Sequence, residues 1–238
     1  MLEVTGILEQ NVNMINLNPD GYFISASDTD AGKTYIACQL IKQLNKFPLK
    51  VVTRKPAESG CRSDDNDNRL PADAIALQTA NNNKESLDVI CPHRFQAALA
   101  PHRAAGLEGK SLSIKQLIDA SLNQSEGSCL IVEGAGGFYS PIADDGLNAN
   151  IATALQLPVI LVIDDRVGAV NQALLTVAAV EQQHLTVAAV IFNRTHADHE
   201  SGMQNAEDFS RFNSAPVFEC GFEQALANIF KQSIVKQA

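Results

Sequence analysis

A Gly-Lys-Thr triplet ends the segment Ala26–Thr34, which stands between an apolar run that predicts a strand and an amphipathic run that predicts a helix over residues 33–46. In such a strand, loop and helix, backbone N–H groups at the helix N-terminus can surround a polyphosphate. The ammonium of Lys33 can contact the β and γ phosphates, and the hydroxyl of Thr34 can bind Mg²⁺. The segment therefore predicts a P-loop for ATP, although Ala26 stands in the place of the first glycine of the usual motif.

Two carboxylates are placed to complete a magnesium site beside this loop. Glu133 directly follows the strand predicted at Leu130–Val132, and ligands bind at that end of the strands in open α/β sheets. Its alternative is a solvated side chain before a glycine turn. Asp73 opens a predicted helix, where it either binds magnesium or only stabilises the helix dipole. If both bind the metal with Thr34, waters and phosphate oxygens would fill the remaining positions.

A second lysine, Lys55, follows the strand predicted at Val51–Thr53 and so belongs to the same edge of the sheet. Together with Lys33 it would supply fixed positive charge for a transferring phosphoryl group; the alternative is a surface lysine before a turn. The polar stretch Ser59–Pro71 comes next. It is either a solvated surface loop or a mobile loop that closes over a ligand.

Apolar runs alternate with helix-like segments along the whole chain, which is typical of a parallel sheet covered by helices on both faces. The predicted strands are 22–24, 51–53, 130–132, 158–163, 187–192 and 216–218. The predicted helices are 33–46, 72–81, 112–124, 169–184, 200–212 and 222–236. With no internal repeat, we expect one α/β domain over 21–238 with a mostly parallel sheet, preceded by an extension over 1–20 that either packs on it or frays.

The composition predicts a folded domain with the cytoplasm as its default location. Of 238 residues, 45% are hydrophobic and 19% charged, which is enough apolar material for one substantial core. The net charge of −9 disfavours nucleic acid and anionic membranes as partners. We find no apolar run long enough to span a bilayer and no signal-peptide pattern. Five scattered cysteines without a C-x-x-C pair indicate reduced thiols and neither disulfides nor zinc.

In order and spacing, these motifs resemble those of the dethiobiotin synthetase family, within the P-loop NTPase superfamily. The similar patterns are D-T-[DE]-x-G-K-T, K-P-x-x-[ST]-G, a D-A-x-x-L helix start, a Pro-His segment, V-E-G-A-G-G-x-x-x-P and a late strand that ends in Asn. They stand here at 28–34, 55–60, 73–77, 101–102, 132–141 and 191–193. The resemblance covers roughly residues 21–221.

The resemblance implies an enzyme that makes dethiobiotin from 7,8-diaminononanoate, CO₂ and ATP with magnesium, and that releases ADP and phosphate. One amine would capture CO₂ as a carbamate, the carbamate would attack the γ-phosphate, and the second amine would close the ureido ring. Carried over position by position, the catalytic residues would be Lys55, Lys33 and Thr29. Ser59 would bind the carbamate or the diamine.

The resemblance also implies which residues hold the metal, the nucleotide and the far end of the substrate. Thr34, Asp73 and Glu133 would bind magnesium, and Asn193 would read the adenine edge. Asn171 would bind the substrate's carboxylate across a homodimer interface. The residues expected to contact ATP are Asp30, Ala31, Gly32, Lys33, Thr34, Tyr35, Asp73, Glu133, Gly134, Ala135, Gly136, Asn193 and Arg194.

The alternative from a different class is a partner-stimulated P-loop ATPase switch of the partitioning or cell-division type. The K-G-G-x-G-K-[ST] loop of those proteins carries an extra lysine, and this chain has Asp28 at that position. The C-terminal segment 223–237 is not basic enough for a membrane-binding helix. Both features favour the enzyme over the switch.

Overall fold

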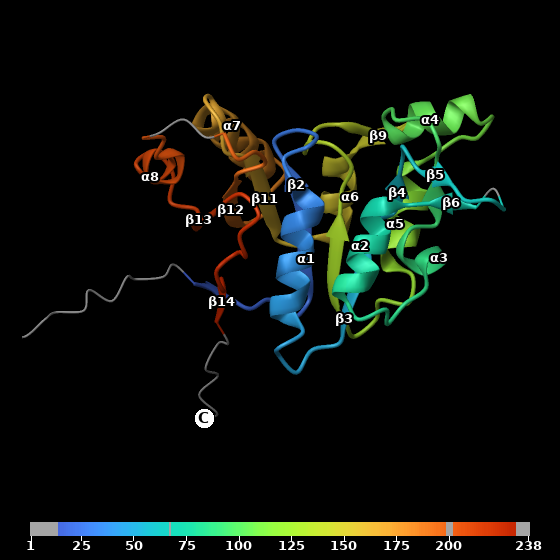
Figure 1. The fold of residues 1–238 in the computed structure, drawn as a ribbon, viewed down its shortest axis with the longest axis horizontal. Helices are drawn as coiled ribbons and strands as arrows, with labels where there is room; N and C mark the ends of the chain where they lie inside the picture. Colours follow the sequence, from blue (N-terminus) through green and yellow to red (C-terminus); the bar gives the residue numbers. More distant parts are fainter. Residues whose placement is uncertain (1–13, 67, 199–201, 232–238) are drawn as a thin grey trace, which may run out of the picture.

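A six-stranded parallel sheet forms the centre of the computed structural model, which describes residues 14–66, 68–198 and 202–231 (Figure 1). The strand order is β13-β12-β11-β2-β8-β3. The strands are β2 (Gly21–Ala26), β3 (Val51–Arg54), β8 (Cys129–Glu133), β11 (Val159–Asp164), β12 (Val187–Asn193) and β13 (Val217–Cys220). All six predicted strands and the predicted α/β fold are confirmed.

Helices cover both faces of the sheet because alternate side chains of each strand point to opposite sides. In β2, Tyr22 and Ile24 pack in one core cluster with α1 (Lys33–Leu44) and α2 (Ala72–Ala80). Phe23 points into the other cluster, on the opposite face. The helices on that face are α4 (Pro101–Leu107), α5 (Ile114–Leu122), α6 (Asn148–Leu155), α7 (Ala169–Gln182) and α8 (Asn205–Ser210).

The sheet order places the carboxyl ends of β2, β8 and β3 beside one another. In the register of β2 with β8, Ile24 lies opposite Glu133. In the register of β3 with β8, Arg54 lies opposite Val132. The P-loop, Glu133 and Lys55 therefore leave the sheet at one edge from adjacent strands.

The structure also contains short elements that the hydrophobic pattern did not predict. They include the helices α3 (Leu87–Ile90), α4 and α6. Three small sheets are formed by β4 (Ala57–Glu58) with β7 (His93–Arg94), β5 (Arg62–Ser63) with β6 (Arg69–Leu70), and β9 (Pro141–Ala143) with β10 (Gly146–Leu147). The stretch predicted as a loop at 59–71 therefore contains the exposed hairpin of β5 and β6.

The helix predicted at 222–236 is wrong for the part that the structure describes. Residues 222–229 contain a turn and no helix, Phe230–Lys231 forms strand β14, and 232–236 lie outside the described residues. Leu226, Ile229 and Phe230 have helix-like spacing, but all three are buried against the cluster that contains α1. Tertiary packing therefore overrides the local pattern. The helix predicted at 200–212 is shorter, at Asn205–Ser210, and 199–201 are also outside the described residues.

The N-terminal segment reaches across to this last strand. Strand β1 (Ile15–Asn16) pairs in parallel with β14, and Ile15 is buried in the same cluster as Phe230. Residues 14–20 of the predicted extension thus pack on the domain, whereas 1–13 lie outside the described residues. Within the described ranges, we find no helix with the length and apolar character needed to cross a membrane.

Candidate active site

The P-loop turns between β2 and α1 through two residues in the left-handed region. Asp30 has φ 56°, and Gly32, at the N-cap of α1, has φ 85°. A Cβ at residue 32 would lie 2.2 Å from Nδ2 of Asn193, so both the conformation and the space require glycine. Ala26, in the place of the motif's first glycine, is the last residue of β2 and is buried. Its side chain is accommodated because residue 26 belongs to a strand and not to the turn.

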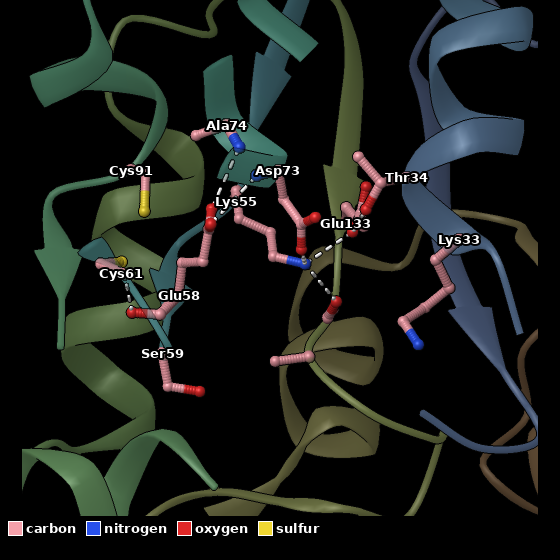
Figure 2. Close-up of polar contacts among 12 residues, drawn as sticks. Lys33, Thr34, Lys55, Glu58, Ser59, Cys61, Asp73, Ala74, Cys91 and Glu133 are labelled. Carbon is pink, nitrogen blue, oxygen red and sulfur yellow. Dashed lines mark hydrogen bonds and ion pairs between the residues drawn. The ribbon is translucent and has the colours of Figure 1, made fainter. Parts of the chain in front are cut away.

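A buried lysine joins two carboxylates in front of this loop (Figure 2). Nζ of Lys55 lies 2.5 Å from Oε1 of Glu133 and 2.8 Å from Oδ2 of Asp73. Lys55 also donates a hydrogen bond to the backbone oxygen of Gly134 at 3.2 Å. The hydroxyl of Thr34 donates to Oε1 of Glu133 at 2.7 Å. Groups from α1, α2, β8 and the segment after β3 therefore meet at one point.

The cluster sets the charges of its members. Burial alone would lower the pKa of Lys55, but the carboxylates of Glu133 and Asp73 hold that pKa above its ordinary value. Burial alone would raise the pKa of Asp73, but the charge and hydrogen bond of Lys55 keep it below its ordinary value. At neutral pH Lys55 is therefore an ammonium and Asp73 a carboxylate.

Lys33 brings a second positive charge to the same region. Its side chain is buried, and its Nζ donates to the backbone oxygen of Asp28 at 3.1 Å. Burial and the positive charge of Lys55 lower the pKa of Lys33. An anion bound between the two lysines would relieve this repulsion, so the arrangement favours phosphate.

These groups line a cleft of about 450 Å³. Thr29, predicted to be catalytic, and Ser59, predicted to bind the substrate, also line it. The full lining consists of Thr29, Asp30, Gly32, Lys33, Thr34, Lys55, Glu58, Ser59, Asp73, Glu133, Ala135 and Gly136. Most of the predicted catalytic, metal-binding and phosphate-binding residues are thus brought together.

The oxygen ligands of this cleft suit a hard cation that shares its coordination with phosphate. Oε2 of Glu133 is buried without a hydrogen-bond partner, so its lone pairs face no donor. The position of the Lys55 ammonium shows that Glu133 and Asp73 converge on one positive charge. The described residues contain no group of three His, Cys, Asp or Glu side chains that could hold a metal. Magnesium would therefore depend on Thr34, these two carboxylates, and oxygens from a nucleotide and water.

Two residues predicted to bind ATP act as supports for neighbouring backbone and side chains. Asn193 is buried at the end of β12, and its Nδ2 donates to the backbone oxygen of Ala31 at 2.9 Å. The side chain of Asn193 thus holds the P-loop in place. Nε of Arg194 donates to Oδ2 of Asp165 at 3.2 Å.

Tyr35, Gly134 and Asn171, which were also predicted to bind a ligand, are not among the residues that line the cleft. The hydroxyl of Tyr35 donates to the backbone oxygen of Gln224 at 2.8 Å, which ties α1 to the turn after β13. Gly134 contributes its carbonyl oxygen to Lys55. Asn171 lies in the first turn of α7, is exposed, and is not among the residues that line the cleft.

Glu58 is a residue of this cleft that the motifs leave unspecified, because it occupies an x position of K-P-x-x-[ST]-G. Its carboxylate accepts hydrogen bonds from the backbone N–H groups of Asp73 and Ala74, at 3.0 Å each. Burial and the charge of Asp73 raise the pKa of Glu58. The sequence signal for this role of Glu58 is Pro71. A proline at the N-cap offers no side-chain acceptor, so the cap of α2 has to come from another part of the chain.

A central strand, a phosphate-binding loop and a helix, with an acidic residue at the end of the adjacent strand, define a P-loop nucleoside triphosphatase. A ParA family ATPase from Chlorobium tepidum TLS has the same fold, with a TM-score of 0.52 over 86% of this chain and 85% of that chain, at 12% identity. The signal recognition particle receptor FtsY from Elizabethkingia anophelis, in complex with GDP, gives a TM-score of 0.50 at 20% identity, over 88% of this chain and 58% of that chain. At these identities the likeness concerns the fold alone.

Sequence comparison narrows this class to one family. A family model described as an AAA domain matches residues 20–224. The ATP-dependent dethiobiotin synthetase BioD of Vesicomyosocius okutanii subsp. Calyptogena okutanii is 38% identical over 91% of this chain and 95% of that protein. The BioD of Bacillus subtilis strain 168 is 32% identical over 90% of this chain and 91% of that protein. The chain belongs to the dethiobiotin synthetase family.

We expect Lys55→Ala to destabilise the ligand-free protein, because Glu133 and Asp73 would lose the cation between them. Glu133 is 1% exposed, and removing one partner of a buried ion pair costs about 3–5 kcal/mol. Urea unfolding measures the change, and added Mg²⁺ should restore part of the lost stability. Lys115→Ala is the matched control, since its pair with Asp119 is exposed. Equal urea midpoints for the two variants would contradict the structural role of Lys55.

Proposed function

We propose that this chain is a dethiobiotin synthetase that converts 7,8-diaminononanoate and CO₂ to dethiobiotin with ATP and Mg²⁺, and releases ADP and phosphate. The observation that carries the proposal is the cluster of the buried Lys55 and Glu133 with the partly exposed Asp73, directly beside the P-loop. It combines fixed positive charge with hard oxygen ligands on one wall of the cleft. The names of the relatives that match most of the chain state the same activity.

The chemistry requires three bond-forming attacks at neighbouring positions. One amine adds to CO₂ and loses a proton to give a carbamate. A carbamate oxygen attacks the γ-phosphorus, the P–O bond to ADP breaks, and a carbamic-phosphoric anhydride forms. The second amine then attacks the carbonyl carbon, the C–O bond breaks, and phosphate leaves as the ring closes and the amine loses its proton.

The side chains of the cleft match the charges that develop in these steps. Lys55 and Lys33 would stabilise the anionic carbamate and the phosphoryl group in transfer, because both are buried cations that face the same cleft. Thr29 and Ser59 would donate hydrogen bonds to the carbamate or accept them from the diamine. In the ligand-free structure the hydroxyl of Ser59 donates to the backbone oxygen of Leu99 at 2.6 Å, and this bond would exchange for one to substrate.

Nucleotide and metal would share the P-loop end of the cleft. Backbone groups of residues 30–35 and 134–136 would surround the phosphates, and Asn193 with Arg194 would lie toward the base. Magnesium, held by Thr34, Asp73 and Glu133, would neutralise charge on the phosphate oxygens.

We also infer that the active enzyme is a homodimer. Val167, Leu175 and Tyr139 are large apolar side chains with exposed fractions of 73%, 65% and 42%. The hydroxyl of Tyr139 donates to the backbone oxygen of Ala179 in α7 at 3.3 Å, so the loop after β8 and α7 form one surface. That loop also lines the cleft. A second copy packed on this surface would supply Asn171 to the carboxylate end of the substrate, with N–H groups of the α7 N-terminus as further donors.

A cytoplasmic location, without nucleic acid or membrane as partner, completes the proposal. It rests on the net charge of −9 and on five cysteines that are all free thiols, four of them buried.

The test is an assay of the purified chain with 7,8-diaminononanoate, ATP, Mg²⁺ and bicarbonate. We expect dethiobiotin and ADP in equal amounts, and neither product when the diamine is left out. ATP hydrolysis that proceeds without the diamine and increases with a protein or lipid partner would favour the ATPase switch.

Asp73→Asn and Glu133→Gln should each raise the magnesium concentration needed for half-maximal activity, because each change removes an anionic ligand and nearly preserves volume. Magnesium titrations at saturating ATP and diamine measure the effect. Asp119→Asn, in an exposed ion pair outside the cleft lining, serves as the control. Unaltered titration curves for both cleft variants would eliminate the proposed metal site.

A shared active site predicts complementation between an inactive chain and one with weakened diamine binding. In a hybrid of Lys55→Ala and Asn171→Ala chains, one site would carry both changes and the other neither. An equal mixture should therefore recover about a quarter of wild-type turnover at low diamine concentration. No recovery after denaturation and joint refolding, or full activity of a monomer at assay concentration, would refute the shared site.

A further inference from the structure

Helix α2, which carries Asp73, begins without a cap from its own sequence. Its N-cap residue is Pro71, and no side chain of the helix start accepts a hydrogen bond from the first turn. The N–H groups of the second and third helical residues are the ones that an N-cap side chain normally satisfies. Here those residues are Asp73 and Ala74.

Glu58 supplies the missing cap from another part of the chain (Figure 2). Its Oε1 accepts the N–H of Asp73 and its Oε2 accepts the N–H of Ala74, each at 3.0 Å. Both bonds go to a carboxylate at a helix N-terminus, which is the favourable direction for the helix dipole.

Glu58 is itself held by backbone pairing. It lies in β4, opposite Arg94 of β7, and its carbonyl oxygen accepts the N–H of Phe95 at 2.9 Å. The residue is 6% exposed. A fixed strand therefore presents the carboxylate, and α2 is located by it.

The contacts run from this strand to the reacting groups. Glu58 fixes the backbone of Asp73, and the carboxylate of Asp73 lies 2.8 Å from Nζ of Lys55. Glu58 also lines the cleft itself, next to Ser59. The carboxylates of Glu58 and Asp73 repel each other, so Glu58 affects the charge of the site as well as the helix that it caps.

We propose that Glu58 is a positioning residue that holds the Asp73 carboxylate in place for Lys55 and for magnesium. The inference rests on the proposed function for the identity of the metal. Without Glu58 the first turn of α2 is less well fixed, and the carboxylate of Asp73 is no longer held in one position. Lys55 then loses an ion-pair partner, and magnesium loses a ligand.

The experiment compares Glu58→Ala and Glu58→Gln with Glu108→Ala. Glu108 is a matched control, because its carboxylate accepts the backbone N–H of Gln96 at 2.9 Å and it does not line the cleft. The first readout is Mn²⁺ binding to the protein–ATP complex without diamine, followed by electron paramagnetic resonance. The second is the Mg²⁺ concentration for half-maximal dethiobiotin formation.

We expect Glu58→Ala to weaken Mn²⁺ binding and to raise the Mg²⁺ requirement by about tenfold or more. Glu58→Gln keeps one acceptor oxygen and turns an amide toward the other N–H, so its effect should be intermediate. Glu108→Ala should match the wild type in both readouts. If Glu58 acts through Asp73, then adding Glu58→Ala to Asp73→Asn should weaken Mn²⁺ binding no further.

Several results would overturn the inference. They are wild-type Mn²⁺ binding in folded Glu58→Ala, equal effects of the Glu58 and Glu108 changes, or additive effects of Glu58→Ala and Asp73→Asn. If Glu58→Ala does not fold, Glu58→Gln decides by the same criteria. A wild-type chain that makes no dethiobiotin refutes the proposed function, while Mn²⁺ binding still tests the role of Glu58.

Discussion

The buried ammonium group of Lys55 links the segments that meet at the carboxyl end of the sheet. Lys55 is 3% exposed and lies between carboxylates that come from β8 and from α2. Two lysines in the cleft, Lys33 and Lys55, face four acidic residues, Asp30, Glu58, Asp73 and Glu133, so the ligand-free cleft has a surplus of acidic groups. We expect a divalent cation to offset both this surplus and the charge of a polyphosphate, so that nucleotide and metal would bind this cleft as a pair.

Most of the central sheet could be predicted from sequence because its strands, apart from the edge strand β13, are largely buried and therefore read as short continuous apolar runs. Val159–Asp164 is such a run, bounded by a proline and a charged segment. The segment after β13 shows the limit of the method. Its apolar spacing fits a helix, but the side chains serve a contact with α1 and β1 that only the folded chain provides. The helices α4 and α6 were missed because they are short and rich in alanine, with little amphipathic contrast.

The residues of the candidate site fall into the same two groups: those that sequence order predicts and those that depend on the complete fold. Parallel strands end at a common edge, so the P-loop, Lys55 and Glu133 could be brought together from sequence order alone. The roles of Glu58 and Asn193 could not, since each acts on a backbone far away in the chain. Glu58 caps a helix from a separate strand, and Asn193 ties the P-loop to β12. Local patterns carry no information on such contacts, because they depend on which residues the completed fold places side by side.

The segment before β14 packs against α1, and this contact affects how the chain can fold during synthesis on the ribosome. Gln43 of α1 donates from Nε2 to the backbone oxygens of Leu226 and Ala227, and its Oε1 accepts the N–H of Ile229. Helix α1 is made early, but these partners emerge only after nearly all of the described chain has been translated. Until then the side-chain amide of Gln43 and the apolar side of α1 lack these partners, and the contact between Gln43 and Leu226 joins residues 183 positions apart in the chain. A nascent chain stalled before residue 226 would have a complete P-loop sequence and an unsealed core, which is the state that chaperones bind.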